Sequence, residues 1–247
     1  MQKVYLVIDL KSFYASVECV ERGLDPLTTR LVVADPTRTE KTICLAVSVE
    51  MKRLGIKNRC RVFDIPKNMD YIMAPPRMKK YIEYAAKIYR IYLNYIAPED
   101  IHVYSIDEAF LDVTPYLKMY GKDGRGMAEM LMTAIWKEVG VRATAGVGSN
   151  MYLAKIALDI MAKKSPDFIG VLDEESYRTQ LWDHRPITDF WMISGGTANR
   201  LLSIGIRDMG GIARWSSTEQ GEDKLYKLFG KNAEIIIDHA WGQDDTP

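Results

Sequence analysis

The sequence predicts an α+β protein built on a ferredoxin-like sheet, and three observations lead to that class. Residues 4–10 (VYLVIDL) form an almost wholly apolar run, which is typical of a buried strand. Residues 103–113 (VYSIDEAFLDV) place two short apolar segments around the group IDE, as in a β-hairpin. When residues 11–76 are set aside, the order is strand, helix, hairpin, helix, strand, helix, which is close to a ferredoxin-like sheet covered on one face by helices.

The remaining elements follow from hydrophobic periodicity and from turn residues. Helices are expected where apolar residues recur at helical spacing, at residues 12–22, 77–95, 127–139 and 152–163. Further short strands are expected at residues 31–34, 42–47 and 143–148. From about residue 170 the pattern changes to short helical pieces punctuated by glycine, such as TANRLLSIGI and DMGGIARW.

Composition narrows the functional classes. A chain of 247 residues with 47% hydrophobic residues can bury a sizeable core. No apolar run approaches the roughly 18 residues of a membrane span, and the apolar start has no cleavage site, so neither a membrane partner nor a signal peptide is expected. Three cysteines without metal-ligand spacing suit a reducing cytosol, which predicts a cytoplasmic location.

Charge is balanced overall but not along the chain. Residues 30–90 contain 14 Lys and Arg against 6 Asp and Glu, whereas residues 165–247 contain 8 against 14. The basic surplus in the first region suggests a polyanionic partner. A solvated basic face explains the same surplus equally well.

Three carboxylates are the strongest chemical signal. Asp9 ends a strand that, in this topology, lies beside the hairpin carrying Asp107 and Glu108. Carboxylates this close repel one another unless a cation neutralises them, and oxygen ligands without His or Cys select Mg²⁺ or Mn²⁺. Two such ions roughly 3.5–4 Å apart serve phosphoryl transfer. The alternative is structural: Asp9 caps the next helix and Asp107 shapes a turn.

Three stretches resemble one family in order and spacing. VIDLKSFYASVE, VYSIDEAFLDV and GVGSNMYLAKIALDIMAK are similar to the Y-family translesion DNA polymerases, most closely their UmuC-like UV-damage repair branch, over residues 1 to about 240. The resemblance implies a palm at residues 1–10 and 77–167, a small α/β fingers domain at residues 11–76, and a small helical thumb at residues 168–240. It also implies primer-template DNA and deoxynucleoside triphosphates as partners.

The resemblance assigns roles to residues by position. Asp9, Asp107 and Glu108 match the family's catalytic metal ligands, with the carbonyl of Leu10 a further ligand, which implies two Mg²⁺ ions that Mn²⁺ can replace. Tyr14 matches the aromatic gate that excludes a ribose 2′-hydroxyl, and Phe13 lies beside it in the expected nucleotide site. From the residues alone, Tyr14 is instead a core aromatic, since one of this adjacent pair must face inward.

Two lysines and one turn match the family less closely. Lys52 and Lys163 take the places of basic residues against the triphosphate, although single lysines are more often solvated surface charges. Many members have Tyr where this chain has Val49. The expected DNA-binding turn of a helix-hairpin-helix motif has Met and Ser where two glycines usually stand, which predicts a weak or altered phosphate contact; its expected contact residues are Ser194, Gly195, Gly196 and Thr197.

The sequence therefore predicts a template-directed DNA polymerase of the translesion type. The family continues into a little-finger domain after the point where this sequence stops, so we expect either a truncation or a minimal form that borrows DNA affinity from a partner. A sliding clamp or other repair proteins are possible partners through such C-terminal regions. Two alternatives stay open: a nucleotidyl cyclase, which also carries paired carboxylates on a ferredoxin-like hairpin, and a catalytically idle DNA-binding or scaffold subunit.

Overall fold

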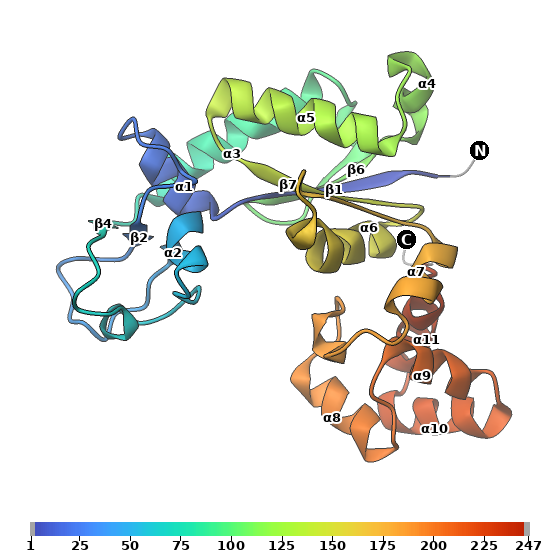
Figure 1. The fold of residues 1–247 in the computed structure, drawn as a ribbon. Helices are drawn as coiled ribbons and strands as arrows, with labels where there is room; N and C mark the ends of the chain where they lie inside the picture. Colours follow the sequence, from blue (N-terminus) through green and yellow to red (C-terminus); the bar gives the residue numbers. More distant parts are fainter. Residues whose placement is uncertain (1–2, 245–247) are drawn as a thin grey trace. The chain divides into compact units, whose positions relative to one another are not determined.

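The computed structural model describes residues 3–244 and has mixed α and β structure around two sheets (Figure 1). The larger sheet has five strands in the order β5-β6-β1-β7-β8. Its first four strands have the order of a ferredoxin-like fold, which confirms the predicted class. The bounds of the five strands are β1 (Tyr5–Leu10), β5 (Ile101–Val103), β6 (Glu108–Asp112), β7 (Ala143–Gly148) and β8 (Ile169–Leu172).

Strand β8 was not predicted and extends the sheet beyond the ferredoxin-like core. It pairs with β7 in parallel, with Ala145 opposite Ile169 and Gly148 opposite Leu172. The sequence pattern after residue 170 was interpreted as helical pieces only, and the prediction was wrong for this segment. A four-residue strand with a glycine in it carries too little periodicity to be recognised locally, because parallel pairing joins residues that are distant in the chain.

The chain forms two compact units, and strands β1, β6 and β7 contribute residues to both. The N-terminal unit contains Asp9–Ala109 and Glu129–Thr144, and the rest of the chain forms the C-terminal unit. No helix in the described part of the chain is long and apolar enough to cross a membrane.

A small three-stranded sheet forms one end of the N-terminal unit. Its strand order is β3-β2-β4, with β2 antiparallel to β3 and parallel to β4. Apolar residues beneath it, among them Val32, Val47 and Met51, form a separate core. The bounds of the elements in this unit are α1 (Phe13–Val20), β2 (Leu31–Val33), β3 (Ala46–Val47), α2 (Val49–Arg53), the 3-10 turn η1 (Val62–Asp64), β4 (Ile72–Ala74), α3 (Met78–Leu93) and the 3-10 turn η2 (Pro98–Asp100), together with most of α5 (Gly124–Val139).

The predicted strand at residues 42–47 is shorter than expected. Only Ala46–Val47 is strand, because the preceding peptide groups bond to a different segment. The Cys44 N–H donates to the carbonyl of Cys60 at 2.7 Å, and the Val62 N–H donates to that of Thr42 at 3.0 Å. These residues therefore form an isolated bridge outside the small sheet.

The C-terminal unit is mainly helical, and α8 to α11 pack together in Figure 1. One apolar core runs from α6 through these helices and includes Tyr152, Tyr177 and Phe190. The remaining elements of this unit are η3 (Thr114–Tyr116), α4 (Leu117–Tyr120), α6 (Met151–Ile156), η4 (Ala157–Met161), η5 (Ala162–Lys164), α7 (Glu174–Leu181), η6 (Ile187–Asp189), α8 (Gly195–Ser203), α9 (Met209–Ser216), α10 (Glu219–Phe229) and α11 (Asn232–Trp241).

The helix predicted at residues 152–163 changes its hydrogen-bonding pattern along its length. It begins as α6, continues as a π-helical turn in η4 and ends as the 3-10 turn η5. It lies directly on glycines of the neighbouring strands, since a Cβ atom at Gly146 would overlap the carbonyl of Ala154 and one at Gly170 would overlap that of Ala157. The π-helical turn begins at Ala157, the residue that packs on Gly170.

A buried carboxylate connects α1 to α3 in the N-terminal unit. The Glu18 side chain is fully buried and accepts hydrogen bonds from Arg77 Nε at 2.9 Å, Arg77 Nη2 at 2.8 Å and the Tyr81 hydroxyl at 2.8 Å. Arg22 forms a further ion pair with it. Burial raises the pKa of the Glu18 carboxyl, but the hydrogen bonds from Arg77, Arg22 and Tyr81 outweigh burial, and the net pKa is lowered.

Glu18→Gln is therefore expected to lower the free energy of unfolding at pH 7 by about 1–3 kcal/mol, because it removes the acceptor of several charged donors. A lowered pKa stabilises the fold above the unfolded carboxyl pKa of about 4.3, and this contribution is lost as pH falls through the folded pKa. The difference from the wild type should thus be constant from neutral to mildly acidic pH and shrink below about pH 4. Urea unfolding across this range measures it.

Glu83→Gln is the matched control for that experiment. Glu83 also pairs with a basic residue of α3, Lys80, but its side chain is 45% exposed. Removing an exposed pair should change stability by no more than about 1 kcal/mol. Equal losses in the two variants would contradict the role assigned to Glu18.

Candidate active site

The candidate site lies where β1 ends beside the start of β6. The two strands are neighbours in the sheet, and the Leu10 N–H donates to the carbonyl of Asp107 at 3.0 Å. Leu10 itself is buried, whereas Asp9 is half-buried. The strand pairing thus brings Asp9 and the Asp107–Glu108 pair to the same end of adjacent strands, as the sequence predicted.

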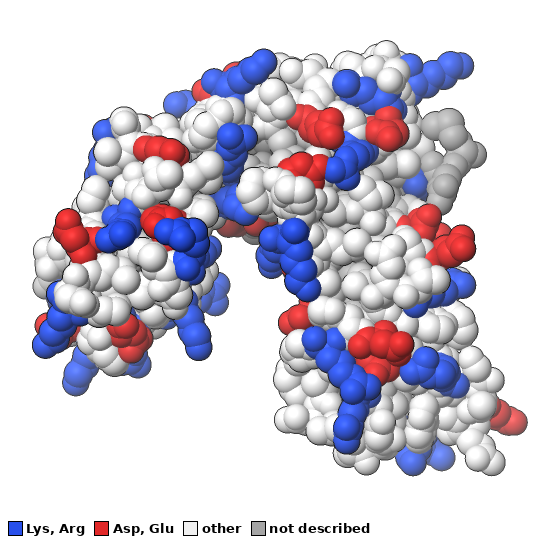
Figure 2. Space-filling model, viewed as in Figure 1, with Lys and Arg blue, Asp and Glu red and all other residues white. Residues whose placement is uncertain are grey.

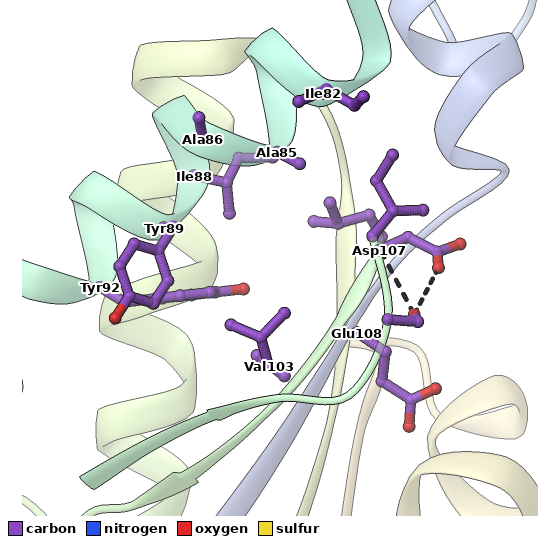
Figure 3. A pocket seen from close by; sticks show the side chains of 13 residues that line it. Ile82, Ala85, Ala86, Ile88, Tyr89, Tyr92, Val103, Asp107 and Glu108 are labelled. Carbon is purple, nitrogen blue, oxygen red and sulfur yellow. Dashed lines mark hydrogen bonds between the residues drawn. The ribbon is translucent and has the colours of Figure 1, made fainter. Parts of the chain in front are cut away.

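The turn between β5 and β6 fixes the position of Asp107. The Ser105 hydroxyl donates to Asp107 Oδ1 at 2.8 Å, and the Asp107 N–H donates back to Ser105 Oγ at 3.3 Å (Figure 3). The N–H groups of Tyr104 and Ser105 both donate to the carbonyl of Glu108 at 3.0 Å. These bonds hold the two carboxylates on a tight turn, with Glu108 as the first residue of β6.

An apolar pocket of about 270 Å³ lies behind this turn. Helix α3 forms one wall with Ile88, Tyr89 and Tyr92, and Val103 faces them from β5 (Figure 3). The carboxylates of Asp107 and Glu108 point away from these apolar side chains in the same view. The pocket therefore lies on the other side of the turn from the two carboxylates.

The electrostatic effects of two carboxylates reach neighbouring tyrosines. Burial raises the pKa of Tyr92 far above its ordinary value, and the negative charge of Asp9 raises it further. The pKa of Tyr14 is also raised, first by burial and then by the charge of Asp107. Both tyrosines therefore stay neutral and face a negatively charged region.

The carboxylates fit a hard divalent cation by their chemistry. They supply only oxygen ligands, and Glu108 Oε1 is shielded from solvent, a costly position for a charged oxygen without compensation. Within residues 3–244, however, no group of three or more His, Cys, Asp and Glu side chains is gathered closely enough to hold a metal ion. Binding would therefore require the carboxylates to draw together.

Helix α1 places an aromatic pair next to this region. Phe13 is buried in the core, so it is the member of the pair that faces inward. Tyr14 is half-buried and stacks on Tyr81 of α3 with ring centroids 4.4 Å apart. The residue before the helix, Ser12, has a φ of 49° in the left-handed region. The chain therefore turns sharply between the end of β1 and the start of α1. Only three residues separate Asp9 from the first residue of that helix.

The two predicted lysines lie in different units. Lys52 is exposed on α2 of the N-terminal unit. Lys163 belongs to the C-terminal unit, in η5, where its ammonium group lies 3.6 Å from Asp159. Asp159 also pairs with the largely buried Lys155 at 3.1 Å. The N-terminal unit contains the three carboxylates, Tyr14 and Lys52, and the C-terminal unit contains Lys163. The role of each of these residues stays a prediction.

The basic surplus of residues 30–90 lies on an exposed surface of the N-terminal unit. Lys and Arg side chains are visible around the small sheet and α2 in Figure 2. Two of the arginines are compensated locally, Arg38 by Asp35 and Arg53 by Glu50. The exposed basic residues of this surface are Arg30, Arg38, Lys41, Lys52, Arg53, Lys57, Arg59, Arg61 and Lys67.

The predicted DNA-binding turn is preceded by one residue in the left-handed region. Met192 has a φ of 68°, a left-handed conformation that glycine adopts without cost. Ser194 caps α8, since its hydroxyl accepts a hydrogen bond from the Thr197 N–H at 3.1 Å. Gly195 and Gly196 form the first turn of that helix.

Two residues that position the site were not found from the sequence. Ser105 orients Asp107, and its signal was the pattern Ser-x-Asp, a common hydroxyl-stabilised turn. Tyr81 stacks on Tyr14. In the sequence, however, Tyr81 looks like any other buried residue on that face of α3, so nothing marks it as part of the site. Local sequence could have indicated the first residue and not the second.

Comparison with solved structures defines the class of protein. The structure of DinB from Sulfolobus solfataricus matches with a TM-score of 0.78 and 25% identity, covering 99% of this chain and 68% of that one. A Y-family DNA polymerase chimera of Dbh and Dpo4 matches with a TM-score of 0.81 and 26% identity, with 99% and 69% covered. The fold is thus that of the catalytic core of Y-family DNA polymerases.

The chain belongs to the impB/mucB/samB family, whose model matches residues 8–159. The Bacillus subtilis (strain 168) protein UvrX is 35% identical over 98% of this chain and 56% of its own length. DNA polymerase IV 2 of the same organism is 31% identical over 100% of this chain and 58% of its own length. The predicted family resemblance is confirmed, and the chain spans a little over half the length of these relatives.

Proposed function

We propose that this chain is a template-directed DNA polymerase of the translesion type, which adds deoxynucleotides to a primer 3′ end. The observation that carries the proposal is the pairing of β1 with β6, which brings Asp9 beside Asp107 and Glu108. The family, whose members include proteins named DNA polymerase IV, supports the same activity.

We assign the carboxylates of Asp9, Asp107 and Glu108, with the carbonyl of Leu10, to two Mg²⁺ ions that Mn²⁺ can replace. Such ions, when bound, lower the pKa of the primer 3′-hydroxyl and neutralise charge on the triphosphate. The chain's own contribution is positioning. Ser105 holds the Asp107 carboxylate through its hydroxyl, and the short turn keeps Glu108 beside it. Catalysis of this kind consists mainly of positioning and charge stabilisation.

Tyr14 and the basic surface would bind the other reactants. We assign Tyr14 to the nucleotide site, where it would contact the incoming sugar from its stacked position on Tyr81. Phe13 would belong to this site only as the buried ring that supports Tyr14 from the core. Lys52 and Lys163 would contact the triphosphate. The exposed basic residues around the small sheet suit the phosphate backbone of primer-template DNA, which is bound largely through Lys and Arg.

We propose the domain boundaries that the resemblance to the Y-family polymerases implies. Residues 1–10 and 77–167 form the palm, residues 11–76 the fingers and residues 168–240 the thumb. In the thumb, the turn Ser194 to Thr197 would contact DNA phosphate through backbone N–H groups. The left-handed Met192 supports this assignment, because its φ of 68° is a conformation that glycine, the usual residue of the motif's turn, adopts without cost.

Primer extension across a template ultraviolet photoproduct tests the proposal, with Mg²⁺ and then Mn²⁺, beside an undamaged template. We expect metal-dependent extension on both templates. A cyclisation assay with ATP and GTP runs in parallel, because a nucleotidyl cyclase would form cyclic products and no extended primer. Failure to extend any primer with either metal would contradict the polymerase assignment.

A further inference from the structure

Two cysteines of the N-terminal unit, Cys44 and Cys60, lie opposite each other. In the sequence they are separate from the proposed catalytic residues. Cys44 precedes β3, and Cys60 follows α2. Ile43 and Arg61 form an antiparallel bridge, and the Cys44 N–H donates to the carbonyl of Cys60 at 2.7 Å. Cys44 and Cys60 are therefore directly opposite each other on two antiparallel segments.

This pairing satisfies the backbone requirement of a disulfide. Only one backbone hydrogen bond joins the two residues, since the Cys60 N–H donates to the carbonyl of Lys57, but directly opposite residues of antiparallel segments in general have Cα atoms about 4.5–5.5 Å apart, with side chains on the same face. Disulfides form across Cα separations of about 4.4–6.8 Å. The two thiols also interact directly, since the pKa of Cys44 is raised to about 12, first by burial and then by the neighbouring Cys60 thiol.

The two thiols differ in exposure in a way that orders their reactions. Cys44 is fully buried against apolar residues such as Val47 and Met51. Cys60 is half-buried and lies between Arg59 and Arg61 in the chain, and cationic neighbours are typical of reactive cysteines. An oxidant in solution should therefore react with Cys60 first, and the buried Cys44 should react second, with the oxidised Cys60.

We propose that Cys44 and Cys60 form an intramolecular disulfide when the protein is exposed to hydrogen peroxide. The Cys60 thiolate attacks one peroxide oxygen, the O–O bond breaks, and Cys60 becomes a sulfenic acid while one water leaves after protonation. The Cys44 sulfur then attacks the Cys60 sulfur, the S–O bond breaks, and a second water carries away the hydroxyl and the Cys44 proton. Two thiols are oxidised and one peroxide is reduced to two waters. A dithiol reductant reverses the reaction.

The cross-link would close a ring around α2. Residues 45–59 lie inside it, including Lys52 on the exposed face of that helix. Cross-linking restricts the unfolded chain more than the folded one, so the oxidised protein should unfold at a higher temperature than the reduced one. The modification itself does not depend on the proposed polymerase activity.

Mass spectrometry of the peroxide-treated protein tests the proposal. We expect the intact mass to fall by two hydrogen atoms, and peptide mapping to find the Cys44 peptide joined to the Cys60 peptide. Dithiothreitol should restore the original mass, and a thermal melt should show the higher transition only in the oxidised sample. Cys19, which is fully buried in α1, serves as an internal reference because it should react with an alkylating reagent only after denaturation.

Variants separate the disulfide from general oxidation. Cys60→Ser should show no loss of mass and no shift of the melt, and Cys44→Ala should accumulate oxygen on Cys60 without a cross-link. Cys19→Ser should still form the cross-link. Circular dichroism verifies that each variant is folded before treatment. A wild-type protein that gains oxygen atoms on Cys60 without a cross-link, or that links two chains, would overturn the proposal.

Discussion

Asp107→Asn is expected to abolish nucleotide incorporation while leaving the fold intact. The amide has almost the shape of the carboxylate and can still accept the Ser105 hydroxyl, which lies 2.8 Å from Oδ1. What it loses is the negative charge that the proposed metal site requires. Removing one electrostatic contributor from a catalytic site typically costs about 10²–10³ in rate, and a lost metal ligand should cost at least that. Single-turnover primer extension measures the rate, and a thermal melt verifies the fold.

Asp112→Asn is the matched control for that variant. Asp112 ends the same strand β6, and its carboxylate accepts the Thr114 N–H at 2.9 Å, a bond that asparagine can also make. It should extend primers at nearly the wild-type rate. Extension by Asp107→Asn at the wild-type rate would remove this residue from the chemistry and with it the two-metal proposal.

Tyr14→Ala is expected to raise ribonucleotide incorporation by orders of magnitude relative to deoxyribonucleotide incorporation. As a sugar gate, the ring excludes a 2′-hydroxyl by contact, so its removal acts on the choice of sugar. Because Tyr14 is only half-buried, its loss should change the melting temperature modestly. The measurement is the ratio of kcat/KM for matched ribo- and deoxyribonucleotides.

Phe13→Ala provides the contrast, since the neighbouring ring is buried in the core with 3% of its surface exposed. Its truncation should cost roughly 3–5 kcal/mol of stability and lower both activities together. If Tyr14→Ala behaved in the same way, with an unchanged sugar ratio and a large drop in melting temperature, Tyr14 would be a core aromatic.

The sequence predicted the parts of the fold that carry their own periodicity. The buried strand at residues 4–10, the strand at residues 143–148 and the long amphipathic helix that became α3 lie close to their expected positions. Strand β8 and the short length of strand β3 were not predicted, because the hydrogen bonds that decide them come from segments that are separate in the chain. Local patterns do not contain the identity of a distant partner.

The same distinction holds at the site. The proximity of Asp9 to Asp107 could be predicted, because the ferredoxin-like order makes their strands neighbours. Phe13 faces the core, whereas Tyr14 does not. This orientation of the pair depends on the left-handed Ser12, which sets the rotation of α1. The contact between Tyr14 and Tyr81 depends on how α1 packs against α3. The sequence of either helix alone does not determine that packing.

Met192 holds a left-handed backbone conformation although it is not glycine. A non-glycine residue in the left-handed region costs roughly 1–2 kcal/mol, so the surrounding structure must supply that energy. The Ile193 N–H bonds to the Phe190 carbonyl at 3.1 Å, and both of these side chains are buried. Glycine at position 192 would relieve the strain but would also enlarge the freedom of the unfolded chain, and the two effects oppose each other. The free energy of unfolding should therefore differ little between methionine and glycine at this position.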